Sequence, residues 1–273
     1  EIITRHTRAR MYQEGDPADL PWGKLGIDAV VESTGIFRKR EQLQKHLDAG
    51  AKRVLLTVPS ADKIDYTVVL GVNDQGLLQD HRLVSNASCT TNCLAPLVKV
   101  LHQAFGLREG VINTVHAYTN DQSLADVPHA DWRRSRAAAE NIIPTSTGAA
   151  KAVGEVLPEL NGKLDGIASR VPVPDGSVVD LYAELETLTT TCGLNEAIRS
   201  AAATDTFKAV LQYSTEPIVS SDIIGNPHSS IFDASFTQVI EGRYVKVLSW
   251  YDNEWGYANR VCDVLARFAA FSS

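Results

Sequence analysis

The stretch that most constrains this chain runs from Ser85 to Pro96 and reads Ser-Asn-Ala-Ser-Cys-Thr-Thr-Asn-Cys-Leu-Ala-Pro. A short segment with strand character, residues 82–84, precedes it. Apolar residues then recur at helical spacing, at Leu94, Leu97, Val98, Leu101 and Phe105. We therefore predict a strand, a tight turn and a helix, with Cys89 at the turn where the helix begins.

Cys89 is a candidate nucleophile because of this position. A free thiol has a pKa of about 8.5, and the amides of a first helical turn lower it by stabilising the thiolate. The predicted strand 111–116 ends at His116, whose imidazolium would lower that pKa further. A cysteine with a distant histidine is the nucleophile-and-base pattern of covalent catalysis. The alternative is that Cys89 is a small buried hydrophobic residue, as free cysteines commonly are.

Size, charge and cysteine content narrow the classes of function. With 273 residues, 44% of them hydrophobic, the chain is long enough for two domains. The net charge of −7 argues against nucleic acid or an anionic membrane as partner, and no apolar run is long enough to span a bilayer. The four cysteines form no CxxC pair, so no metal is expected. A working thiolate needs a reducing compartment, which predicts a cytoplasmic location.

The first third of the chain alternates strand and helix patterns, which predicts a parallel sheet. The predicted strands are 27–31, 53–56, 66–70 and 83–84, with a helix between about 40 and 50. The polar stretches that follow strands are 33–35, 57–59 and 88–89. Ligands bind beyond the carboxyl ends of such strands, so we expect the three stretches to converge on one crevice, although each by itself is ordinary loop sequence.

The later part of the chain predicts a separate α+β domain. Alternation between residues 177 and 186 indicates a strand with one buried face, and 238–251 is typical of a hairpin that turns at Glu241-Gly242. Thr147 and Gly148 precede an apolar-faced helix, which they either cap or equip to bind an anion. These segments favour a mostly antiparallel sheet.

Four motifs of the chain resemble those of phosphorylating glyceraldehyde-3-phosphate dehydrogenase. They are the cysteine stretch, His-Ala-Tyr-Thr at 116–119, Ile-Ile-Pro-Thr-Ser-Thr-Gly-Ala-Ala-Lys at 142–151 and Trp-Tyr-Asp-Asn-Glu-Trp-Gly-Tyr at 250–257. The resemblance covers essentially the whole chain and implies an α/β fold. Residues 1–88 would form a truncated, Rossmann-type NAD-binding domain completed by the C-terminal helix 255–273. Residues 89–254 would form an α+β catalytic domain with a mostly antiparallel sheet.

The resemblance also implies an activity. D-glyceraldehyde 3-phosphate, NAD and inorganic phosphate would give 1,3-bisphosphoglycerate in glycolysis, through a thioester on Cys89 and with His116 as base. The residues implied to bind substrate and phosphate are Ser88, Thr119, Arg134, Thr147, Gly148 and Arg170. Those implied to bind the cofactor are Thr34, Gly35, Phe37, Thr57, Asn253 and Tyr257. Asn253 could instead cap the final helix, and the clustered arginines near 134 could be a solvated loop.

Further implications concern assembly and alternatives. In the family, the segment 118–141 lies against the cofactor of a neighbouring subunit, which implies a homotetramer, and Val127-Pro128 resembles the NAD-preferring pattern. One alternative is the related erythrose-4-phosphate dehydrogenase. Another is an inactive fragment that lacks the N-terminal part of the family, because the chain begins Glu-Ile-Ile and no Gly-x-Gly-x-x-Gly turn precedes its first strand pattern.

Overall fold

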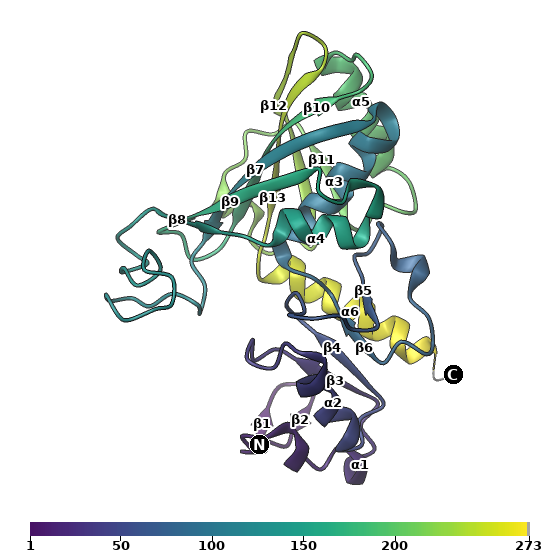
Figure 1. Cartoon of the computed structure of the whole chain (residues 1–273), viewed down its shortest axis with the longest axis vertical. Helices are drawn as coiled ribbons and strands as arrows, with labels where there is room; N and C mark the ends of the chain where they lie inside the picture. The colour runs from purple at the N-terminus through teal and green to yellow at the C-terminus, as the bar shows by residue number, and fades with distance from the viewer. Residues whose placement is uncertain (272–273) are drawn as a thin grey trace.

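The computed structural model describes residues 1–271, which are organised around two sheets (Figure 1). In the described part of the chain the first sheet has the strand order β3-β4-β6-β5, with every pairing parallel. Its strands are β3 Ala29–Glu32, β4 Arg53–Leu56, β5 Tyr66–Thr67 and β6 Leu83–Ser85. The helix α2, Arg40–Asp48, connects β3 to β4, and the short α1, Trp22–Leu25, precedes β3. The predicted parallel α/β arrangement is confirmed.

The strand predicted over 66–70 is shorter than expected. Asn73 explains its early end, because its side chain accepts from the N–H of Val69 at 2.8 Å and donates to the carbonyl of Thr67 at 2.8 Å. These backbone groups are therefore occupied by a side chain instead of a neighbouring strand. The remaining short elements are β1 Ile2–Ile3, β2 Arg8–Ala9, η1 Pro17–Asp19, η2 Asp74–Gly76, η3 Pro158–Leu160 and η4 Ser220–Ile223.

The second sheet has the order β11-β12-β13-β10-β7-β9-β8 among the described residues. Its strands are β7 Leu107–Ala117, β8 Ile143–Ser146, β9 Leu164–Val171, β10 Ser177–Leu185, β11 Leu211–Ser214, β12 Ser230–Ile240 and β13 Tyr244–Tyr251. The β7/β9 and β11/β12 pairs are parallel and the other pairs are antiparallel, as the mostly antiparallel prediction requires. The β12–β13 hairpin turns at Glu241 and Gly242, which have φ values of 51° and 72°.

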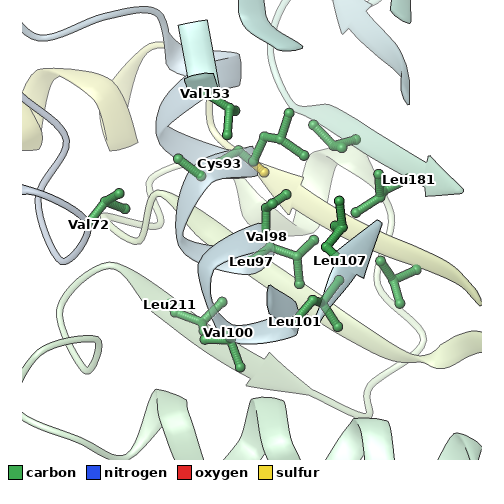
Figure 2. Packing of buried hydrophobic residues seen from close by; sticks show 14 of the residues in the cluster. Val72, Cys93, Leu97, Val98, Val100, Leu101, Leu107, Val153, Leu181 and Leu211 are labelled. Atoms are coloured by element: carbon green, nitrogen blue, oxygen red, sulfur yellow. The ribbon is translucent and has the colours of Figure 1, made fainter. Parts of the chain in front are cut away.

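The helix α3, Cys89–Phe105, forms the centre of the main core. Leu97, Val98 and Leu101 have no exposed surface and pack with Leu107 and Leu181 of the sheet (Figure 2). A helix that is apolar on most of its sides must be buried on most of its sides. Two further helices, α4 Ala149–Val156 and α5 Thr191–Ala202, pack against it. Burial of α3 therefore fixes the direction in which its first residue points.

The last helix, α6 Trp255–Ala270, runs from the second sheet to the first (Figure 1). Its Val264 and Phe268 pack against Leu55 and Val84 of the parallel sheet. The helix predicted over 255–273 thus ends at Ala270, and residues 272 and 273 lie outside the described residues. This helix, the turn that leads into α3 and the segment 69–72, which packs in the main core, connect the two sheets.

We expect Leu97→Ala to lower the free energy of unfolding by about 2–5 kcal/mol, because it leaves a cavity in a fully buried part of the core. Gln103→Ala, on an exposed position of the same helix, is the matched control and should change it by less than about 0.5 kcal/mol. Urea unfolding followed by circular dichroism measures both. Equal losses for the two variants would contradict the burial of α3.

Candidate active site

The turn between β6 and α3 has an unusual backbone. Ala87 is fully buried and has a φ of 54°, in a region that residues other than glycine occupy rarely. The Oγ of Ser85 accepts from the N–H of Ala87 at 3.0 Å and donates to the carbonyl of Val58 at 2.8 Å. Strained backbone of this kind persists only where its surroundings hold it in place. Here Ser85 holds Ala87, whose conformation sets the direction in which α3 begins.

Two side chains fix the first turn of α3. Ser88 is the N-cap, and its Oγ accepts from the N–H of Thr91 at 3.0 Å. The Nδ2 of Asn92 donates to the carbonyls of Asn86 and Ser88 at 2.8 and 3.0 Å. Cys89 is therefore the first helical residue, as predicted.

Cys89 lies against His116, which β7 carries. The Sγ of Cys89 is 3.5 Å from the Nε2 of His116. The imidazole is buried and meets the ring of Tyr251 edge-on, with centroids 5.8 Å apart. The hydroxyl of Tyr251 is in turn hydrogen-bonded to Thr90 and Thr114, at 2.9 and 2.8 Å. The sulfur on α3 and the ring on β7 are thus held in contact, and Tyr251 supports the ring.

The protonation states differ from the sequence-based expectation. Burial raises the pKa of the Cys89 thiol, although the charge of Arg170 and a hydrogen bond from Thr90 oppose this. Burial, followed by the charge of Arg170, lowers the pKa of His116 to about 3. The imidazolium expected beside the thiol is therefore wrong, because the low-dielectric surroundings disfavour the charged form of both groups. Both pKa shifts favour the uncharged forms, a thiol and a neutral imidazole.

Arg170 and Thr119 join this pair. The parallel register of β7 and β9 sets Arg170 directly beside His116. The Nη1 of Arg170 lies 2.9 Å from the Nδ1 of His116 and 3.4 Å from the Oγ1 of Thr119. Its Nε is buried and has no hydrogen-bond partner within residues 1–271. The guanidinium thus has donor capacity left for an anion next to Cys89.

Arg134 is brought close but is already occupied. Its Nε donates to the Oγ1 of Thr145 at 2.9 Å, and its Nη1 forms an ion pair with Asp121. Asp131 lies 3.7 Å from its Nε. The charge of Arg134 nevertheless depresses the pKa values of both His116 and Arg170, behind the larger effect of their burial. Arg134 therefore contributes positive potential to the site while two carboxylates hold it.

Thr147 and Gly148 stand where the sequence predicted, at the start of α4. Gly148 is the N-cap, and the Oγ1 of Thr147 accepts from the N–H of Ala149 at 3.2 Å. The carbonyl of Ser146, one residue earlier, accepts from Nη2 of Arg134 at 3.3 Å. Arg134 is thus bonded to the end of β8, directly before the start of α4.

The predicted cofactor residues of the first sheet converge on Glu32. The N–H and Oγ1 of Thr34 donate to its carboxylate at 2.8 and 2.5 Å, and the N–H and Oγ1 of Thr57 donate to its carbonyl at 3.0 and 3.2 Å. Gly35 follows with a φ of 73°. Phe37, Thr34 and Glu32 line a cavity of 370 Å³. The ends of β3 and β4 thus meet as the parallel topology predicts, but residues 57–59 and 88–89 do not line this cavity.

Asn253 and Tyr257 connect the end of the second sheet to the turn before Cys89. The Oδ1 of Asn253 accepts from Ser177 at 2.7 Å, and its Nδ2 is buried with no partner in the described part of the chain. The hydroxyl of Tyr257 donates to the carbonyl of Ala87 at 3.1 Å. Asp252, which accepts from the N–H groups of residues 254 and 255 at 2.9 and 2.6 Å, caps α6. The capping interpretation of Asn253 is therefore wrong.

Sequence reasoning missed three residues that shape the site. Glu32 anchors the Thr34 loop, Asp121 pairs with Arg134, and Tyr251 supports His116. Glu32 could have been noticed as an acid at the end of an apolar strand, and Asp121 as an acid within a basic loop. Tyr251 ends an alternating strand and carries no comparable signal.

Comparison with known proteins assigns these features to a family. The sequence profile described as "Glyceraldehyde 3-phosphate dehydrogenase, C-terminal domain" matches residues 88–253. The chain belongs to this dehydrogenase family. It is 56% identical to the glyceraldehyde-3-phosphate dehydrogenase of Streptomyces coelicolor, over 93% of this chain and 76% of that protein. It is 58% identical to that of Priestia megaterium, over 98% and 80%, and 56% identical to that of Borreliella burgdorferi, over 96% and 80%.

Across residues 1–271 no helix has the length and apolar character needed to cross a membrane. The same residues contain no group of three or more His, Cys, Asp or Glu side chains arranged to hold a metal ion.

The low pKa of His116 makes stability depend on pH. Because its pKa is about 3 in the folded state and 6.5 unfolded, only the unfolded chain takes up a proton at this residue as the pH falls below 6.5. The stabilisation is complete above pH 6.5 and is lost on acidification. We expect the wild type to lose about 2 kcal/mol more than His116→Asn between pH 6.5 and about pH 5. Urea unfolding at both pH values measures this, and parallel losses would contradict a neutral buried imidazole.

Proposed function

We propose that this chain oxidises D-glyceraldehyde 3-phosphate with NAD and inorganic phosphate to 1,3-bisphosphoglycerate, as a glycolytic enzyme. The observation that carries the proposal is the 3.5 Å contact between Cys89 and the neutral His116, next to the anion-binding groups of Arg170 and Thr119. Membership of the family supports the choice of reaction. Cys89 is the proposed nucleophile and His116 the proposed acid and base.

The first half of the reaction is an acylation of Cys89. The sulfur adds to the aldehyde carbon, and its proton passes through Nε2 of His116 to the carbonyl oxygen, giving a hemithioacetal. The backbone N–H of Cys89, which at the first helical position has no acceptor within the helix, and the Nε2–H of His116 stabilise the developing oxyanion. His116 then accepts the hydroxyl proton as hydride leaves the same carbon, and a thioester remains on Cys89.

The second half transfers the acyl group to inorganic phosphate. Ser88, Thr147, Gly148 and Arg134 are the proposed phosphate site, at the starts of α3 and α4. A phosphate oxygen attacks the thioester carbon, and the Cys89 sulfur leaves and regains its proton. Binding of this phosphate requires Arg134 to exchange its contact with Asp121 for the new anion. The substrate's own phosphate would bind to Thr119 and Arg170.

The residues at the crevice fit a nicotinamide cofactor. The Nδ2 of Asn253, which has no partner among residues 1–271, is a donor of the kind that a carboxamide oxygen requires, and its Oδ1 is held by Ser177. Thr34, Gly35, Phe37 and Thr57 are the proposed contacts on the first sheet, and Tyr257 is the proposed contact on α6. Bound NAD supplies the hydride acceptor. Val127-Pro128 supports NAD over NADP.

A homotetramer is the proposed assembly. The second sheet leaves an apolar face exposed, opposite the helices of the main core. Exposed apolar residues of this sheet include Val111, Ile167, Tyr182, Ile240 and Tyr244. Contiguous apolar faces of this kind usually mark contacts between proteins, and a second copy of the chain is the proposed partner. The need to keep Cys89 reduced supports a cytoplasmic location.

Phosphate-dependent formation of NADH tests the proposed function. The purified chain, given D-glyceraldehyde 3-phosphate, NAD and inorganic phosphate, should produce NADH, and omitting phosphate should stop turnover after one equivalent per site. Cys89→Ser should abolish turnover, whereas Cys192→Ser, at an exposed cysteine, should leave it unchanged. Faster turnover of erythrose 4-phosphate would favour the related dehydrogenase instead. No NADH with either aldehyde would contradict the proposal for this chain.

A further inference from the structure

A network of side-chain hydrogen bonds connects α1 to Thr34, far from Cys89. The Nε1–H of Trp22 donates to the Nδ1 of His46 at 3.1 Å, and the Nε2 of His46 lies 3.0 Å from the Oε2 of Glu32. The other carboxylate oxygen of Glu32 accepts from the N–H and the Oγ1 of Thr34, at 2.8 and 2.5 Å. His46 and Glu32 are buried, whereas Thr34 is exposed at the crevice. Two buried polar groups therefore support a surface residue.

The donors and acceptors of this network can be assigned. An indole N–H only donates, so the Nδ1 of His46 accepts from Trp22 and carries no proton. The ring proton is then on Nε2, which donates to Glu32. Burial by itself would raise the pKa of Glu32, but the hydrogen bonds from His46 and Thr34 outweigh it and lower that pKa. Glu32 is thus a buried carboxylate that depends on these donors.

The packing of α1 on the end of α2 holds Trp22 in place. The N–H of Gly23 donates to the carbonyl of Ala49 at 2.9 Å. Gly50 has a φ of 107°, and a Cβ at this position would overlap the backbone of Gly23. Only glycine allows so close an approach of the two segments. The approach sets the indole of Trp22 against the ring of His46, with centroids 6.4 Å apart.

The network also determines what Thr34 can offer to a ligand. Its Oγ1 gives its one proton to Glu32 and accepts from the N–H of Ile36 at 3.1 Å. A lone pair is what remains, so the hydroxyl can only accept from a ligand. Thr57 is constrained in the same way, because its Oγ1 donates to the carbonyl of Glu32 at 3.2 Å. A hydroxyl or amide group can donate to these oxygens, whereas an ionised phosphate oxygen cannot.

We propose that His46 is a positioning residue, which acts through Glu32 to hold Thr34 as a hydrogen-bond acceptor before a ligand binds. This inference rests on the proposed function, in which Thr34 contacts NAD. Without the donor on His46, the buried carboxylate loses one of its three side-chain and backbone donors, and such a charge is costly to keep in the interior. Glu32 would then take up a proton or turn toward water, and Thr34 would lose its anchor.

Nitrogen NMR of the full chain, labelled with 15N-histidine, tests the network without a ligand. The resonances of His46 are assigned by comparison with His46→Gln. We expect a proton on Nε2 and none on Nδ1. A proton on Nδ1 would overturn the inference, because Nδ1 could then not accept from Trp22, and Nε2 of a neutral ring could not donate to Glu32.

Three variants test whether His46 acts on Thr34. His46→Leu removes the donor to Glu32 and should speed hydrogen exchange of the Thr34 amide by about tenfold. His46→Gln keeps one donor and one acceptor and should restore slow exchange. His6→Leu, the same change at an exposed histidine, should match the wild type. Equal rates in all variants, or no rescue by glutamine, would overturn the proposal. The wild-type tautomer decides alone if His46→Leu does not fold.

Ligand titrations separate this inference from the proposed function. NAD should shift the amide resonance of Thr34, and His46→Leu should weaken NAD binding by about tenfold, whereas His46→Gln should not. Inorganic phosphate at the same concentration should leave that resonance in place, and a shift would contradict the acceptor role of Thr34. A wild type that binds no NAD but shows the expected tautomer and rescue would contradict only the proposed function. Equal NAD affinity in all variants would contradict only the role of His46.

Discussion

The turn between β6 and α3 is the constraint on which the rest of the site depends. Ala87 occupies its strained conformation because Ser85 holds it from the parallel sheet and Tyr257 holds it from α6. Burial of α3 in the core of the second sheet then fixes the direction of the helix. Cys89 is the residue at which these constraints meet. Its place against His116 thus follows from the packing of both sheets and not from the local sequence only.

Charge is distributed around this pair in an unbalanced way. Burial keeps Cys89 and His116 neutral, while Arg170 and Arg134 bring positive charge to the same place. Arg134 has carboxylate partners, whereas the hydrogen bonds that Arg170 makes within residues 1–271 are all to neutral groups. A buried charge without a counterion is costly, so an anion that enters here gains both hydrogen bonds and charge compensation. A phosphorylated substrate meets this requirement better than a neutral one.

The sequence predicted the architecture wherever the pattern of apolar residues was periodic. The helix after Cys89, the strand at 177–185 and the hairpin at Glu241-Gly242 all follow from side-chain spacing, which depends on local geometry. The position of Cys89 at the strand-to-helix turn was predicted for the same reason.

What could not be predicted depends on contacts between distant segments. The neutral state of His116 results from burial and from Arg170, which is 54 residues away and becomes a neighbour only through the register of β7 and β9. Pairing of Arg134 with Asp121, and capping of α6 by Asp252 instead of Asn253, are likewise set by tertiary packing. Residue types and their spacing do not predict which side chains will be buried or which charged groups will lie next to them.

Mass spectrometry of the acylated chain tests the central claim most directly. The protein is mixed with D-glyceraldehyde 3-phosphate and NAD in phosphate-free buffer, quenched in acid and digested. A phosphoglyceryl thioester should appear on the peptide that contains Cys89, and it should disappear when inorganic phosphate is added before the quench. An adduct on Cys93, Cys192 or Cys262, or NADH formation with no adduct on Cys89, would contradict the account.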